Sequence, residues 1–186
     1  MKALLNLFFI LSFGFFISTS KTADVHIKKG SQITISGKSN VNKFSCVYTT
    51  SIAPGCQIVD YNTLSSAIIL DDAKIKLKSE AFDCGGRMIN RDFNKLMQSE
   101  DYPYISITLT QINLKEDVFE VEALIKIAHQ TNLYAFNILP QHNNNYNGNL
   151  KLNINDFDME APRKLLGTIQ VDPVINIEFD LNLEVN

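Results

Sequence analysis

The sequence predicts an all-β fold of antiparallel strands, because apolar and polar residues alternate along most of its 186 residues. Side chains on a strand point to opposite faces with a period of two, so alternation gives a strand one apolar and one polar face. The clearest case is 174–185, where every odd position from Ile175 to Val185 is apolar and every even position from Asn176 onward is Asn, Asp or Glu. Short connections favour antiparallel neighbours that share one apolar interior.

Further segments with this pattern follow one another at short intervals. In chain order, the expected strand segments are 32–36, 43–50, 67–70, 73–79, 104–111, 118–128, 133–139, 149–156, 168–171 and 174–185. They amount to about eight strands. Their alternation places on the inward face, among others, Ile107, Leu109, Phe119, Val121, Ile125, Phe136, Leu152, Ile177 and Phe179.

One segment has helical spacing instead. Phe93, Leu96 and Met97 fall at i, i+3 and i+4, which is the apolar stripe of a short amphipathic helix. Asn90 is a suitable N-cap, and Pro103 prevents the helix from continuing. We expect this stripe to cover the open end of a barrel.

Two architectures can use about eight alternating strands, a closed barrel and a two-sheet sandwich. An eight-stranded barrel is just wide enough to be filled by side chains or to hold one small ligand. Periodicity does not distinguish a filled interior from a hollow one. The residues alone therefore leave both a structural and a ligand-binding role open.

The N-terminal residues have the layout of a secretory signal peptide. Lys2 precedes an apolar stretch over 3–17, and small residues follow at 18–20. The apolar stretch is shorter than the roughly 20 residues that span a bilayer. We expect residues 1–20 to be removed, with cleavage after Ser20 or Ala23, and residues 21–186 to form one domain without a membrane span.

Composition argues against several kinds of chemistry. The net charge of −3 lacks the basic clusters that bind nucleic acid. His26, His129 and His142 are too far apart for a metal motif, and the pair Asp156 and Asp158 fits a turn better than an acid–base site. The sequence therefore indicates no catalytic residues, no metal site and no cofactor.

Three cysteines, Cys46, Cys56 and Cys84, remain after the signal segment. Export favours oxidation, and an odd number leaves one thiol unpaired within the chain. All three pairings are possible from the sequence. We favour a bridge between Cys46, in an expected strand, and Cys84, just before the expected helix, with Cys56 alone in a loop.

Three motifs resemble a known family when taken in order. Residues 37–44 resemble the G-x-S-N-V-H-x-W stretch of YceI-like proteins, with Asn42 and Phe44 where His and Trp are common. Residues 88–105 resemble the family's M-N-x-x-M-x-x-x-L-x-x-x-x-Y-P-x-I segment. Residues 148–181 resemble its closing D-F…G-x-I-x-V…I-x-F-x-L run.

This resemblance implies an extended, eight-stranded antiparallel barrel of lipocalin-like form. It also implies an apolar channel that binds a polyisoprenoid chain, in a periplasmic or secreted protein. The expected ligand is an isoprenoid lipid or a quinone. The channel would be lined by the inward residues of the strands together with Phe93, Leu96 and Met97 of the helix.

The leading functional hypothesis is thus a non-enzymatic binding protein for an isoprenoid-type lipid. A structural or interaction protein with a filled barrel is the second, and an enzyme acting on a lipid is the third. A continuous apolar cavity would favour the carrier, and a packed interior would favour the structural protein. A cavity with paired polar groups at its mouth would favour the enzyme.

Overall fold

The computed structural model describes residues 20–53, 55–164 and 168–186, so that nearly all of the expected signal segment 1–20 lies outside the described residues. One α-helix, α1, spans Arg87–Leu96, and short 3-10 turns occur at Ser79–Ala81 (η1), His142–Asn144 (η2) and Ile154–Phe157 (η3). The strands are β1 Lys21–Ile27, β2 Gln32–Lys38, β3 Lys43–Tyr48, β4 Cys56–Leu64, β5 Ala67–Lys78, β6 Phe82–Asp83, β7 Tyr104–Leu114, β8 Phe119–Ile127, β9 Gln130–Pro140, β10 Asn145–Asn153, β11 Arg163–Lys164, β12 Ile169–Gln170 and β13 Val174–Val185.

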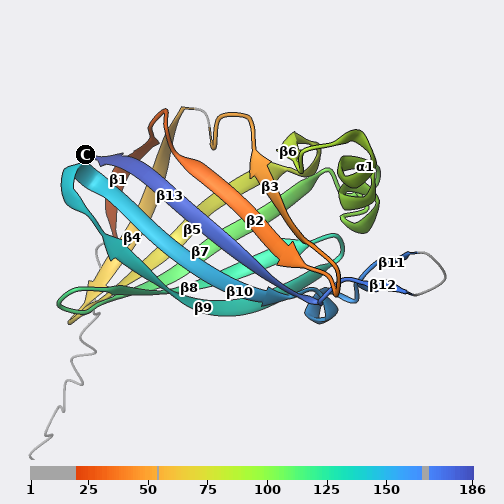
Figure 1. The fold of residues 1–186 in the computed structure, drawn as a ribbon. Helices are drawn as coiled ribbons and strands as arrows, with labels where there is room; N and C mark the ends of the chain where they lie inside the picture. The colour runs from red at the N-terminus through yellow and green to blue at the C-terminus, as the bar shows by residue number, and fades with distance from the viewer. Residues whose placement is uncertain (1–19, 54, 165–167) are drawn as a thin grey trace, which may run out of the picture.

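Eight strands form a closed antiparallel ring in the order β1-β4-β5-β7-β8-β9-β10-β13, and β13 pairs back to β1 (Figure 1). The expected eight-stranded barrel is therefore confirmed, and a two-sheet sandwich is excluded. β13 pairs with β1 near its C-terminal end and with β2 further back, as the pairs Val25–Val185 and Ile35–Ile177 show. Beyond the ring, the sheet continues from β2 to β3 and then to β6, at the end of the barrel that carries α1.

Two irregularities bend the strands of this ring. The register of β5 against β7 shifts between Ile69 and Ala73, and that of β7 against β8 shifts between Leu109 and Gln111. Such bulges add a residue to one strand and increase its local twist and bend. The sequence predicted separate strands at 67–70 and 73–79, but the chain continues through Asp71 and Asp72 as one bulged strand.

Two strands of the ring were not predicted. β1 immediately follows the expected signal segment, and β4 begins at Cys56, where the sequence predicts a loop. These two strands pair with each other and complete the ring at the end away from α1 (Figure 1).

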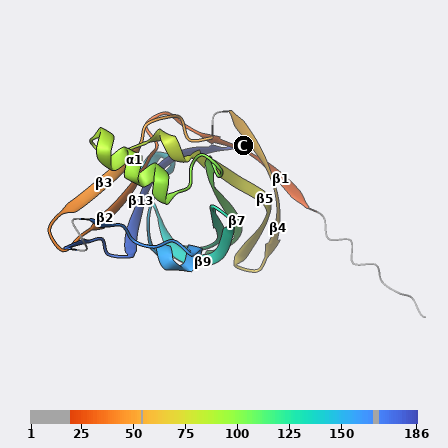
Figure 2. The same ribbon diagram turned by 90° about the vertical axis from the view of Figure 1, so that its right-hand side faces the viewer.

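The helix lies across part of one end of the ring, as expected (Figure 2). It begins at Arg87, with Gly86 at the N-cap position, and so starts three residues before the predicted cap Asn90. Asn90 instead accepts a hydrogen bond from the backbone N–H of Cys84, at 2.7 Å. Among the described residues, no helix has the length and apolar character needed to cross a bilayer.

The carboxylate of Asp83 holds the start of the helix. It accepts hydrogen bonds from the Asn90 side-chain amide and from the Gly85 backbone N–H, both at 3.0 Å. The Asn90 hydrogen bond, followed by that of Gly85, lowers the pKa of Asp83 below its ordinary value of 3.8. The ionised carboxylate is therefore favoured in the folded protein.

This shift predicts a pH-dependent attachment of α1. Because the folded pKa is depressed, the stabilisation is present above pH 3.8 and is lost as the pH falls through the folded value. Above pH 3.8, Asp83→Asn should have a lower free energy of unfolding than the unmodified protein, measured by urea denaturation. The difference should narrow in more acidic solution. If the difference in free energy of unfolding between the two proteins stays the same well below pH 3.8, Asp83 does not have this role.

Candidate ligand-binding cavity

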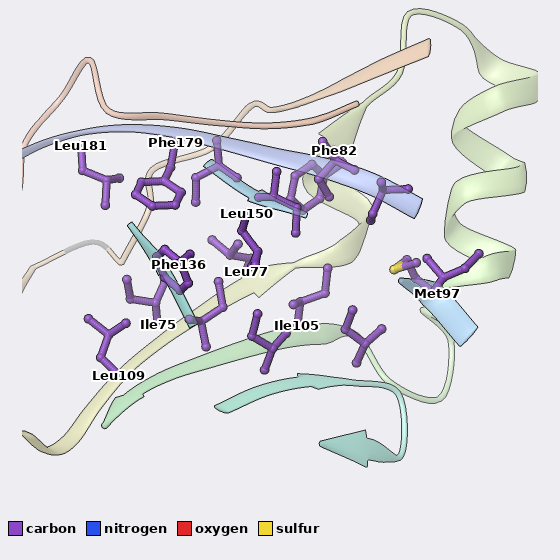
Figure 3. Close-up of a pocket in the computed structure, with 18 of the residues that line it drawn as sticks. Ile75, Leu77, Phe82, Met97, Ile105, Leu109, Phe136, Leu150, Phe179 and Leu181 are labelled. Atoms are coloured by element: carbon purple, nitrogen blue, oxygen red, sulfur yellow. The ribbon is translucent and has the colours of Figure 1, made fainter. Parts of the chain in front are cut away.

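The barrel encloses one elongated cavity with an entirely apolar lining (Figure 3). Its volume is about 110 Å³. The lining residues are Ile33, Ile35, Ile75, Leu77, Phe82, Phe93, Met97, Ile105, Ile107, Leu109, Ile125, Ile127, Phe136, Ile138, Leu150, Ile154, Ile175, Ile177, Phe179 and Leu181. A space of this kind offers water no hydrogen-bond partner and is expected to stay dry.

The two ends of the cavity differ in accessibility. Near α1, lining residues such as Met97, Ile127 and Ile154 are buried. At the other end, Ile138 and Leu181 are partly exposed. The cavity is therefore closed beneath α1 and opens away from it. We call the open end, lined by Leu109, Ile138 and Leu181, the mouth; Figure 3 shows Leu109 and Leu181 far from Met97.

Eight of the twelve residues expected to line a channel lie on this cavity. They are Phe93, Met97, Ile107, Leu109, Ile125, Phe136, Ile177 and Phe179. They come from α1, from the C-cap residue Met97 and from strands β7, β8, β9 and β13, and they follow the apolar spacing of the helix or strand concerned. The alternation pattern thus brings together residues that are far apart in the sequence.

The other four expected residues lie elsewhere. Val121 and Leu152 have no exposed surface and are packed among neighbours rather than beside the void. Phe119 is partly buried and lies 6.3 Å, between ring centroids, from the ring of Tyr146. Leu96 faces the outer side of α1. Alternation assigns the inward face, but the packing of the neighbours decides which inward side chains border a void.

Leu96 belongs to a second, more open depression of about 340 Å³ outside the barrel. This outer groove lies between α1, β3 and the chain around Pro162 and Val171. Phe93 borders both the groove and the cavity. The helix therefore has apolar contacts on two sides, which explains why its stripe extends beyond the residues that cover the barrel.

Twelve lining residues were not among the expected channel set: Ile33, Ile35, Ile75, Leu77, Phe82, Ile105, Ile127, Ile138, Leu150, Ile154, Ile175 and Leu181. Most share the inward phase of an expected strand, so the same alternation carried the signal for them. Phe82 had no such signal, because β6 contains only two residues.

Glycine and two phenylalanines shape the wall near the mouth. The rings of Phe136 and Phe179 meet edge to face, with centroids 5.5 Å apart, a favourable arrangement of aromatic side chains. Gly148 is the direct antiparallel partner of Phe179. A Cβ atom at Gly148 would lie only 1.9 Å from Cζ of Phe179, so the ring lies directly on the glycine.

Polar side chains near the turn that joins β8 to β9 connect β9 to η3 by hydrogen bonds. The hydroxyl of Tyr134 donates to Oδ2 of Asp156 at 2.5 Å, and the side-chain amide of Asn132 donates to the Asp156 carbonyl. Burial, followed by the hydrogen bond to Asp156, raises the pKa of Tyr134 to about 12. The phenol therefore stays protonated at physiological pH, where it fastens η3 to β9.

Within the part of the chain that the structure describes, His, Cys, Asp and Glu side chains form no group of three or more that could hold a metal ion.

A disulfide joins Cys46 of β3 to Cys84, next to β6. Cys46 is almost fully buried and Cys84 is buried. Cys56 is exposed at the start of β4 and is the one cysteine among the described residues outside a disulfide. The bridge fixes the α1 end of the barrel, because Cys84 lies three residues before the helix.

The fold and the cavity together define a class, the lipocalin-like antiparallel barrel with an apolar interior. Several solved structures share this fold. Burkholderia cenocepacia BcnA matches with a TM-score of 0.64 at 15% identity, over 83% of this chain and 96% of that protein. A polyisoprenoid binding domain from Saccharophagus degradans matches with a TM-score of 0.55 at 11% identity, over 88% and 98% of the two chains.

The YceI protein of Campylobacter jejuni matches with a TM-score of 0.51 at 12% identity, over 80% of this chain and 84% of that protein. No family model and no curated protein matches the sequence. The resemblance to YceI-like proteins is thus confirmed for the fold: this chain has the YceI-like barrel, with a sequence far removed from these solved structures.

The structure brings two of the three resembling motifs into contact. Residues 37–44 run from β2 into β3, and their Asn40 side chain donates to the carbonyl of Thr168 and accepts from the backbone N–H of Gln170. Ser39 forms a β-bridge with Val171. The first motif therefore contacts the closing motif directly, although about 130 residues separate them.

Proposed function

We propose that this protein is a non-enzymatic, exported binding protein that holds an isoprenoid-type lipid, a polyprenyl chain or a quinone tail, in the barrel cavity. The observation that carries the proposal is the elongated cavity without a polar lining atom. Such a lining favours an unbranched or methyl-branched hydrocarbon and offers no anchor to a polar molecule. The Saccharophagus degradans domain with the same fold is described as polyisoprenoid-binding, which supports this ligand class.

The energetics of burial fit this ligand. Each buried CH₂ group contributes about 0.8 kcal/mol, so a five-carbon isoprene unit contributes up to roughly 4 kcal/mol. Association and ordering costs offset part of this gain. A few buried units are therefore sufficient for tight binding.

The volume of the cavity limits how much of a lipid chain can enter without a change in the barrel. The cavity volume of about 110 Å³ is similar to that of an engineered apolar cavity of about 150 Å³ that binds benzene. A chain of several isoprene units therefore requires side chains to move apart. The partly exposed residues toward the mouth have the freedom for this movement, whereas the buried residues beneath α1 have less.

Export agrees with the cysteine chemistry. A buried disulfide such as Cys46–Cys84 is typical of oxidising compartments. Together with the signal-like residues 1–20, it supports a periplasmic or secreted protein.

The decisive test is native mass spectrometry of the protein purified from the cells that produce it naturally. We expect a lipid to co-purify with the protein and to be released by organic solvent. The masses of its homologues should differ by whole isoprene units. Purified, delipidated protein should take up a polyprenol or a quinone analogue. If no lipid co-purifies and neither analogue binds, the carrier function is wrong and a structural role for the barrel replaces it.

A further inference from the structure

We infer that Phe179 is the gate of the cavity and that Gly148 is the recess that keeps the gate open. The inference rests on the proposed function, because it concerns how a hydrocarbon chain passes into the same cavity. Phe179 lines the cavity one inward position before Leu181, at the mouth side (Figure 3). A chain that enters from the mouth must therefore pass its ring.

The backbone at Gly148 does not itself require glycine. Its φ lies outside the left-handed region, unlike that of Gly30, Gly55 and Gly85. Glycine within a strand also lacks a side chain for packing and weakens the strand. What Gly148 provides is space, because the Phe179 ring occupies the volume that a Cβ atom would take.

A side chain at position 148 would force the ring of Phe179 to move. On one side, the ring of Phe136 lies 5.5 Å away, between centroids. On the other side, the direct partner of Phe179 is the buried Ile33 of β2. Both sideways directions are thus occupied. Along β13, Ile177 and Leu181 line the cavity before and after Phe179, so the ring is displaced away from the wall and into the cavity. Even one methyl group should narrow the passage at this level.

The chain supplies a matched control. Gly37 and Phe44 form a second pair of this kind, in which an added Cβ would lie 2.4 Å from Cζ of Phe44. Phe44 borders the outer groove and not the cavity. Gly37→Ala therefore causes a similar local clash without moving a ring into the passage.

The test compares Gly148→Ala, Gly37→Ala and the double variant Gly148→Ala/Phe179→Leu, each with its thermal stability. Because the chain has no tryptophan, farnesol and a longer polyprenol each carry a dansyl label at the alcohol end, and their uptake is measured by stopped-flow fluorescence of the label. Xenon binding is measured under gas pressure. Gly148→Ala should slow or weaken polyprenol uptake by about tenfold or more and reduce xenon binding. Gly37→Ala should not, and the double variant should recover uptake because leucine no longer fills the passage.

Xenon separates this inference from the proposed function, because an apolar cavity binds xenon whatever its natural ligand is. If the unmodified protein takes up xenon but no polyprenol, the isoprenoid function is wrong. The gate is then tested by comparing xenon binding in Gly148→Ala with that in the unmodified protein. The gate is wrong if Gly148→Ala matches the unmodified protein with both probes. It is also wrong if Gly37→Ala loses as much uptake, or if the double variant recovers none.

Discussion

Replacing both Cys46 and Cys84 with alanine is expected to lower the free energy of unfolding by about 4 kcal/mol. The bridge closes a loop over a sequence separation of 38 residues. Constraint of the unfolded chain by a loop of this length corresponds to a value between about 3 and 4.7 kcal/mol. Alanine is the suitable replacement, because a serine hydroxyl would be buried at position 46, where the side chain is almost fully enclosed.

Urea denaturation under non-reducing conditions measures this loss, and Cys56→Ala is the control. Cys56 is exposed and takes no part in a disulfide, so its replacement should leave the unfolding midpoint nearly unchanged. The double replacement should also loosen the attachment of α1, which the bridge fixes beside β6. Equal midpoints for the double replacement and the unmodified protein would show that the bridge does not stabilise the barrel.

The strands that the sequence predicted well have one wet face and one apolar face. β13 and β8 follow this rule over most of their length, because they separate the interior from solvent. β4 departs from it, since Ile58 is 70% exposed on the outer face while the neighbouring Val59 is 8% exposed on the inner face. Two adjacent apolar residues remove the period of two on which the prediction of a strand depends.

β1 was missed for a different reason. Ala23, Val25 and Ile27 alternate with polar residues, so the strand signal is present. The segment lies directly after the expected cleavage region, and a cleavage site after Ala23 would remove part of the strand. The pairing of β1 with both β4 and β13 is long-range information that the local pattern does not contain.

The cavity itself was predictable only in part. Alternation identifies the face of a side chain, and it succeeded for residues such as Ile125 and Ile177. Whether a void remains depends on side-chain volumes contributed by several strands at the same level. The recess at Gly148 illustrates this point, because the sequence shows a glycine in a strand and only the pairing with Phe179 shows the space that it provides.

A carboxylate placed inside the barrel should abolish lipid binding. Ile125 lines the cavity and is 2% exposed, so Ile125→Glu places an ionisable group among apolar side chains. An unpaired buried charge is strongly unfavourable, and the glutamate would bind a proton or draw water into the cavity. We expect a loss of stability of several kcal/mol, measured by urea denaturation, together with loss of polyprenol binding.

The matched control is Leu124→Glu on the same strand. Leu124 points outward and is 39% exposed, so the same charge one residue away should leave polyprenol affinity nearly unchanged.

Because Ile125→Glu can lose binding simply by unfolding, a second variant, Leu181→Asn, tests binding in a barrel that stays folded. Leu181 is partly exposed at the mouth, and asparagine has nearly the shape of leucine but adds an amide to the apolar lining. The folded barrel should persist while affinity falls by about tenfold or more, since an amide without a partner costs roughly 1–3 kcal/mol beside a hydrocarbon chain. Unchanged affinity in Leu181→Asn and in a folded Ile125→Glu would place the ligand outside the barrel.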